Sequence, residues 1–94
     1  MADEVLAPNA KPRLPNHVML RQDHGRNRWV LLAPERVLTP DAVAVEVLKL
    51  CDGERTIESI ARCLADTYDA PYERILTDIS AMLASLVEKG VIVT

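Results

Sequence analysis

Aromatic residues are scarce in this sequence, and phenylalanine is absent altogether. The 94 residues include only one tryptophan, Trp29, and two tyrosines, Tyr68 and Tyr72. Any hydrophobic core must therefore be assembled mainly from the aliphatic residues that dominate an apolar fraction of 49%. A chain of this length can build one modest core, so we expect a single domain.

Long apolar runs and an excess of positive charge are also missing. No apolar stretch approaches the roughly 18 residues of a membrane span, and no basic segment followed by an apolar one suggests a signal peptide. The formal net charge is −3, whereas nucleic acids and anionic membranes attract basic surfaces. We therefore expect a cytoplasmic protein whose partners include neither nucleic acid nor membrane.

Residues that could carry chemistry are few and poorly grouped. Cys51 and Cys63 are the only cysteines; they do not form a C-x-x-C pair, and each falls in a helical pattern that favours a small apolar role. His17 and His24 have no cysteine or acidic partner at a useful spacing, and no glycine-rich phosphate loop is present. We therefore expect no catalytic residue, no metal site and no cofactor, which indicates a binding protein and not an enzyme.

The first 14 residues are predicted to form a flexible tail. Pro8 and Pro12 interrupt any regular pattern there, and apolar residues are sparse. From His17 onward, polar and apolar residues begin to alternate. The folded domain is therefore expected to span residues 15–94, with the tail left mobile unless a partner orders it.

Three short extended segments follow the tail. Residues 17–21 and 28–32 alternate like strands, and the glycine-containing cluster at 23–27 predicts the turn of an antiparallel hairpin. Residues 36–38 form a third extended piece between two prolines. Because no fourth strand is evident, at least one sheet edge is expected to stay unpaired, with N–H and C=O groups ready to bind an extended peptide.

The segment after Thr39 is ambiguous between helix and strand. Alternating valines at 43, 45 and 47 resemble a strand, whereas apolar residues at 44, 47, 48 and 51 have helical spacing. Thr39 as an N-cap hydroxyl, Pro40 at the first helical position and the Asp52-Gly53 stop together favour the helix.

Two further helices show clearer patterns. Thr56 is expected to cap the second, whose apolar residues fall on one face as far as Tyr68. The third should run from Tyr72 to Lys89 with a wide apolar stripe, followed by Gly90 and then a final short strand or apolar tail. This order predicts an α+β, winged-helix-like fold, in which an N-terminal three-stranded antiparallel sheet precedes a three-helix bundle.

Several motifs point to a known family. The longest are Leu31-Leu32-Ala33-Pro34-Glu35-Arg36-Val37-Leu38 and Cys51-Asp52-Gly53-Glu54-Arg55-Thr56-Ile57, with Asp78-Ile79 and a Leu-x-x-x-Gly ending after them. They resemble the PqqD family of pyrroloquinoline quinone (PQQ) biosynthesis, over about residues 15–93. The resemblance implies a peptide chaperone, a recognition element for ribosomally synthesised and post-translationally modified peptides (RiPPs). Such a chaperone binds the precursor peptide PqqA and presents it to the radical S-adenosylmethionine (SAM) enzyme PqqE.

The resemblance also implies where the peptide would bind. In the family, the peptide adds as a strand beside the third strand, in the groove that this strand forms with the third helix. The strand corresponds here to Arg36, Val37, Leu38 and Thr39. From the apolar stripe of the helix, the residues expected to border the groove are Leu76, Leu83 and Val87. Those expected to face the core are Ile75, Ile79 and Leu86, and the expected polar contacts are Arg36 and Asp78.

Two alternatives remain open from the sequence. A winged-helix DNA-binding regulator would use residues 72–89 as its recognition helix, but that helix carries only two basic residues, Arg74 and Lys89, beside three acidic ones. An open strand edge also leaves a homodimer as an alternative to a monomer. The Asp52-Gly53-x-Arg55-Thr56 motif is interpreted as structural, with a docking surface for the enzyme as the alternative.

Overall fold

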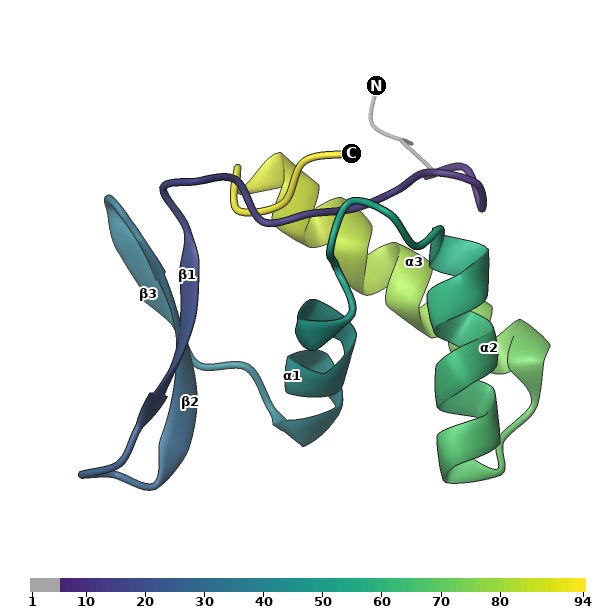
Figure 1. Ribbon diagram of the computed structural model, residues 1–94, viewed down its shortest axis with the longest axis horizontal. Helices are drawn as coiled ribbons and strands as arrows, with labels where there is room; N and C mark the ends of the chain where they lie inside the picture. Colours follow the sequence, from purple (N-terminus) through teal and green to yellow (C-terminus); the bar gives the residue numbers. More distant parts are fainter. Residues whose placement is uncertain (1–5) are drawn as a thin grey trace.

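The computed structural model describes residues 6–94, and three strands in it are followed by three helices (Figure 1). The strands are β1 (Met19–Asp23), β2 (Arg28–Ala33) and β3 (Arg36–Leu38). The helices are α1 (Ala42–Lys49), α2 (Ile57–Tyr68) and α3 (Tyr72–Glu88). This order confirms the expected α+β fold. Within the described part of the chain, no helix combines the length and apolar character needed to cross a bilayer.

The sheet has the order β1-β2-β3, and both strand pairs are antiparallel. The turn between β1 and β2 is the predicted one, and Asn27 adopts there a left-handed φ of 53°, which asparagine tolerates better than most residues. β3 pairs with β2 through three residue pairs. Among residues 6–94, no strand pairs with the other edge of β3, so that edge is open.

All three helices lie on one side of the sheet (Figure 1). Strand side chains alternate between faces, so Leu31 of β2, which is only 1% exposed, points toward the helices. Leu20 and Leu38 lie opposite Leu31 on the neighbouring strands and share its face. The buried residues that the helices contribute to this core include Val47, Ile57, Ile60, Ala61 and Leu83.

Side-chain caps begin the first two helices. At α1 the cap is Asp41 and not Thr39, so the sequence prediction was wrong by two residues. Asp41 has an extended backbone, and its Oδ1 accepts a hydrogen bond from the Ala44 N–H at 2.8 Å. Its carboxylate accepts that bond, and its negative charge interacts favourably with the positive end of the helix dipole. Thr56 caps α2 as expected, with Oγ1 3.1 Å from the Ser59 nitrogen.

Residues 6–14 lie against the domain and differ from the flexible tail that the sequence suggested. Arg13 forms two backbone hydrogen bonds with Val93, at 2.9 and 3.0 Å, and Pro12 is fully buried. The carbonyl groups of Pro8, Ala10 and Pro12 accept hydrogen bonds from N–H groups at the start of α2 and in the loop before it. Within the described residues, packing against the domain thus includes Leu6 and the segment after it, and residues 1–5 of the expected tail lie outside the described residues.

The loop between α1 and α2 is ordered by the Asp52-Gly53-x-Arg55-Thr56 motif. Oδ1 of Asp52 accepts hydrogen bonds from the N–H groups of Glu54 and Arg55 at 2.9 Å each, and Oδ2 lies 3.2 Å from Nη1 of Arg55. These N–H donors, with the Arg55 charge as a smaller contribution, hold the pKa of the Asp52 carboxyl below its usual value. Gly53 has a φ of 81°, a conformation that favours glycine. The motif thus has a structural role in joining the two helices.

Candidate functional site

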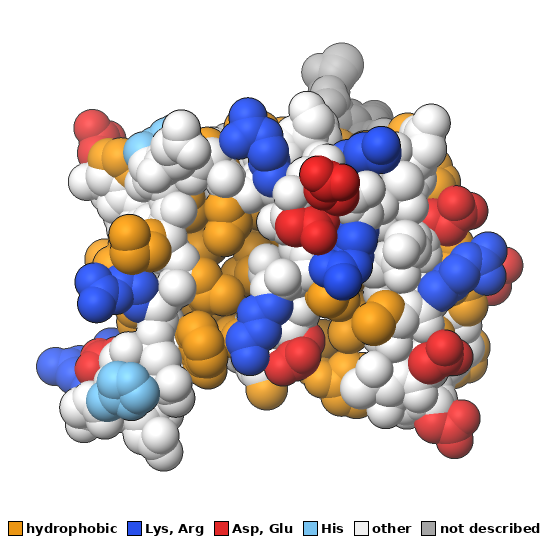
Figure 2. Space-filling view, in the orientation of Figure 1, with side chains coloured by type: hydrophobic (Ala, Val, Ile, Leu, Met, Phe, Trp, Pro, Cys, Tyr) orange, Lys and Arg blue, Asp and Glu red, His pale blue; other side chains and the backbone are white. Residues whose placement is uncertain are grey.

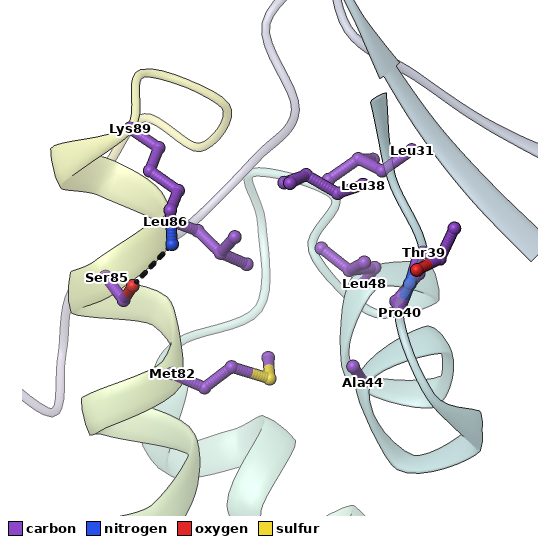
Figure 3. Close-up of a pocket in the computed structure, with 10 residues that line it drawn as sticks. All are labelled: Leu31, Leu38, Thr39, Pro40, Ala44, Leu48, Met82, Ser85, Leu86 and Lys89. Carbon is purple, nitrogen blue, oxygen red and sulfur yellow. Dashed lines mark hydrogen bonds between the residues drawn. The ribbon is translucent and has the colours of Figure 1, made fainter. Parts of the chain in front are cut away.

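A groove separates the C-terminal half of α3 from β3, the linker after β3 and α1 (Figure 3). Its volume is about 440 Å³. Figure 3 shows the side chains of Leu86 and Met82 pointing from α3 toward Leu38, Leu48 and Ala44 across the opening. The lining residues are Leu31, Leu38, Thr39, Pro40, Ala44, Leu48, Met82, Ser85, Leu86 and Lys89. The groove therefore lies directly beside the open edge of β3.

Each wall of the groove follows from local structure. Leu31 and Leu38 are paired across β2 and β3, so both point to the helical side of the sheet. Ala44 and Leu48 are four residues apart in α1, and Met82, Ser85, Leu86 and Lys89 have the i, i+3, i+4, i+7 spacing of one helix face. The groove is thus formed by mainly apolar side chains from four elements, β2, β3, α1 and α3.

One end of the groove is polar. The Lys89 ammonium group donates a hydrogen bond to Ser85 Oγ at 3.2 Å, one turn earlier on α3 (Figure 3). Lys89 forms no ion pair within residues 6–94. This site can therefore offer a ligand the backbone N–H and C=O groups of the β3 edge, an apolar floor and one cation.

The residues predicted from the third strand lie at this site. Leu38 and Thr39 line the groove, and Arg36 and Val37 belong to β3, whose edge borders it. Val37 points to the opposite face of the sheet, because it alternates with Leu38, and is 60% exposed. The four residues predicted from the third strand therefore lie at or beside the groove, and two of them, Leu38 and Thr39, line it directly.

The residues predicted from the third helix do not line the groove. Leu83 is 0% exposed and belongs to the core, and Leu76 lines a separate hollow with residues of the N-terminal segment. Val87 is half-buried against the core and Asp78 is exposed. Leu86, which was expected to face the core, packs against it and also lines the groove.

The error is one of helical phase. Successive residues of a helix are rotated by about 100°, so choosing Leu83 in place of Met82 moves the assigned face by more than a quarter turn. The 82, 85, 86, 89 stripe is visible in the sequence, but α3 is apolar over so wide an arc that periodicity alone could not separate its groove side from its core side. Ile79 is buried in the core as expected, and Ile75 is partly buried and packs against it.

Chemically reactive groups do not gather at this groove. Burial raises the pKa of the Cys51 thiol to about 12, with the neighbouring Asp52 charge as a smaller cause, and its Sγ lies 3.3 Å from the Val47 carbonyl oxygen in the core. Across residues 6–94, no three His, Cys, Asp or Glu side chains come together in a way that could hold a metal ion. The geometry is that of a binding surface.

Similarity to characterised proteins agrees with this geometry. The PqqA binding protein of Bradyrhizobium diazoefficiens is 54% identical over 81 residues, which cover 86% of this chain and 79% of the relative. The bifunctional coenzyme PQQ synthesis protein C/D of Methylorubrum extorquens is 53% identical over 81 residues, 86% of this chain and 22% of that longer protein.

Two solved structures have the same fold. The solution NMR structure of the PqqD portion of Methylobacterium extorquens PqqCD, a stand-alone RiPP recognition element, superposes with a TM-score of 0.77 at 48% identity, covering 95% of this chain and all of that one. The crystal structure of PqqD from Xanthomonas campestris gives 0.58 at 35% identity, covering 97% and 94%. The sequence model described as "Coenzyme PQQ synthesis protein D (PqqD)" matches residues 28–92. This chain therefore belongs to the PqqD family.

Proposed function

We propose that this chain is a peptide chaperone of PQQ biosynthesis, which binds the precursor peptide PqqA and presents it to the radical SAM enzyme PqqE in the cytoplasm. The observation that carries the proposal is the open edge of β3 beside an apolar groove. Relatives that share about half of the sequence are named for binding PqqA, which supports PqqA as the ligand. The chain would hold the peptide without changing it chemically.

The binding mode follows from what the edge and the groove supply. PqqA would extend the sheet beside Arg36–Leu38 and Thr39, with alternate side chains entering the groove between Leu38 and Leu86. Backbone hydrogen bonds contribute roughly 0.5–1.5 kcal/mol each, and each buried aliphatic side chain contributes about 1.5–3 kcal/mol. Association costs about 4–15 kcal/mol, so the edge alone is insufficient and the groove must provide much of the affinity.

An NMR titration of the ¹⁵N-labelled chain with synthetic PqqA tests the proposal. We expect one-to-one binding, shifts along residues 36–39 and at Met82, Ser85, Leu86 and Lys89, and an unchanged peptide mass. The hollow formed by Leu6, Pro8 and Leu76 is an internal control, because it touches the same helix on another side. Shifts confined to that hollow, or no saturable binding, would refute the proposal.

A second copy of the chain could compete for the same edge. Sedimentation velocity across a range of concentrations, with and without PqqA, separates the two occupants of β3. We expect added peptide to leave a complex containing one chain and one peptide, because both ligands would need the same N–H and C=O groups.

A further inference from the structure

The face of the sheet that points away from the helices carries an apolar row across all three strands. Met19, Leu32 and Val37 lie directly opposite one another in the register of β1, β2 and β3. Met19 is 53% exposed and Val37 is 60% exposed, and none of the three helices covers this side (Figure 1). An apolar row that crosses an open sheet face is unusual for a surface that meets only water.

Charged side chains lie beside this row on β1 and β2. Strand alternation places Arg21 and Asp23 on the same face as Met19, and Arg28, the cross-strand partner of Asp23, on the same face as Leu32. His17, Met19, Arg21 and Leu32 also line a hollow of about 330 Å³ at one end of the face. The outer face therefore has an apolar row that borders a hollow, with two arginines and one aspartate beside it.

The charge of the chain is divided between its two halves. Residues 15–39 contain four arginines and two acidic residues, whereas residues 40–94 contain five basic and ten acidic residues. Figure 2 shows most of the acidic side chains in that view over the helices, away from the sheet at the left. A protein of net charge −3 thus presents its sheet as a locally basic surface, which attracts acidic partners.

We propose that this outer face, centred on Met19, Leu32 and Val37, docks an apolar surface with an acidic rim on the enzyme that receives the bound peptide, given the peptide binding proposed above. A peptide added beside β3 would continue the sheet past Val37, and every second side chain of that peptide would point to this outer face. A protein docked here would therefore contact the chaperone and the outward side chains of its peptide together, while the groove holds the inward ones.

A second copy of the chain is a poorer occupant of this face. A twofold dimer would bring each patch against its own copy, so the arginines of the two copies would meet and repel one another. An acidic partner removes that repulsion and gains the apolar contact as well. Complementary charge and the continuity with the β3 edge thus favour the receiving enzyme.

The test measures the affinity of the preformed complex of this full chain and PqqA for purified PqqE, by isothermal titration calorimetry. Met19→Glu and Arg21→Glu should each weaken this affinity at least about tenfold, the loss expected at a central contact. Val43→Glu and Arg74→Glu are matched controls, since Val43 is 49% exposed on α1 and Arg74 is exposed on α3. Both controls should remain within about twofold of the unmodified chain.

Binding of PqqA alone is measured for every variant, so that the two proposals can fail separately. If the unmodified chain does not bind PqqA, the proposed function fails. If Met19→Glu and Arg21→Glu bind PqqA and also bind PqqE as tightly as the unmodified chain does, the docking face is overturned. A change of sedimentation behaviour in Met19→Glu with unchanged PqqE affinity would also overturn it, in favour of an interface between copies. Arg21 is exposed, so its variant keeps the test valid even if Met19→Glu disturbs folding.

Discussion

Leu86 and Leu76 are chemically identical residues with different surroundings on α3. Both are half-buried, but Leu86 lines the groove beside β3 whereas Leu76 lines the hollow near Leu6 and Pro8. The pair therefore offers a test of the groove in which the type of substitution and the helix are held constant.

Leu86→Ala should weaken PqqA binding about tenfold or more, because burying a leucine side chain of the groove against the peptide contributes about 1.5–3 kcal/mol. Leu76→Ala should leave the affinity within about twofold, although both variants lose some stability from packing. Isothermal titration calorimetry measures the affinities, and thermal unfolding checks that both variants are folded. Equal losses of affinity would show that the groove has been placed on the wrong side of α3.

The two cysteines differ in burial and therefore in expected reactivity. Burial raises the pKa of Cys51 to about 12, so almost no thiolate is present in the folded protein at pH 8, and the thiolate is the reactive form. Cys63 is exposed on α2. With Ellman's reagent at pH 8, we expect one thiol to react rapidly in the native protein and two in denaturant.

Substitution assigns the two thiols. Cys63→Ser should abolish the rapid phase, whereas Cys51→Ala should leave it intact. Rapid modification of Cys51 in a folded Cys63→Ser protein would contradict its placement in the core.

Single residues were also where sequence interpretation was least successful. Thr39 and Asp41 are both good capping residues in the same short segment, and only the backbone conformation selects Asp41. Met82 and Leu83 are both apolar, and their roles in the groove and in the core depend on where α1 and α2 pack. Local patterns do not contain that information.

At the scale of elements, the sequence was much more informative. Alternation and turn residues located all three strands, and Thr56 and Gly90 marked a helix start and a helix end. These features are local, because a cap or a turn is completed within a few residues. The Gly90 end is an example: the N–H groups of Gly90 and Val91 donate to the carbonyls of Val87 and Leu86, at 3.0 Å each.

Gly53 and Gly90 provide a test at this scale. Both have a positive φ, 81° and 78°, and an L-residue in that conformation costs roughly 1–2 kcal/mol. A Cβ at Gly53 would also lie 3.2 and 3.3 Å from Arg13 side-chain carbons, whereas a Cβ at Gly90 would meet nothing within 4 Å. Gly53→Ala should therefore lower the free energy of unfolding more than Gly90→Ala does.

Urea denaturation of the two variants measures this difference directly. Adding Arg13→Ala to Gly53→Ala should recover part of the extra loss, because it removes the outer of the two side-chain carbons that the new methyl group meets. Equal destabilisation by the two glycine substitutions would show that Arg13 does not pack closely on this loop.

The N-terminal segment shows what only the whole molecule can determine. Its prolines and sparse apolar residues resemble those of a disordered tail, yet Pro12 is fully buried and Arg13 pairs with Val93 near the other end of the chain. Contacts between residues so far apart leave no periodic signal in either segment. The sequence therefore predicted the sheet and the helices but not the strap of residues 6–14 that runs across them.

This strap predicts the effect of shortening the chain. A protein that starts at Leu14 loses five backbone hydrogen bonds, which join Pro8, Ala10, Pro12 and Arg13 to the helical half and to Val93. At roughly 0.5–1.5 kcal/mol each, their loss should lower the free energy of unfolding by about 2.5–7.5 kcal/mol, a large part of the 5–15 kcal/mol typical of a domain.

Urea denaturation should show a clearly lower midpoint for this protein than for a matched one that starts at Leu6 and keeps all five bonds. The groove lies between β3 and α3 and includes no residue of the strap, so whatever fraction of the shortened chain is folded should still bind PqqA. If both truncated proteins unfold at the same urea concentration, the strap does not stabilise the domain, and residues 6–14 behave as the tail that their composition suggests.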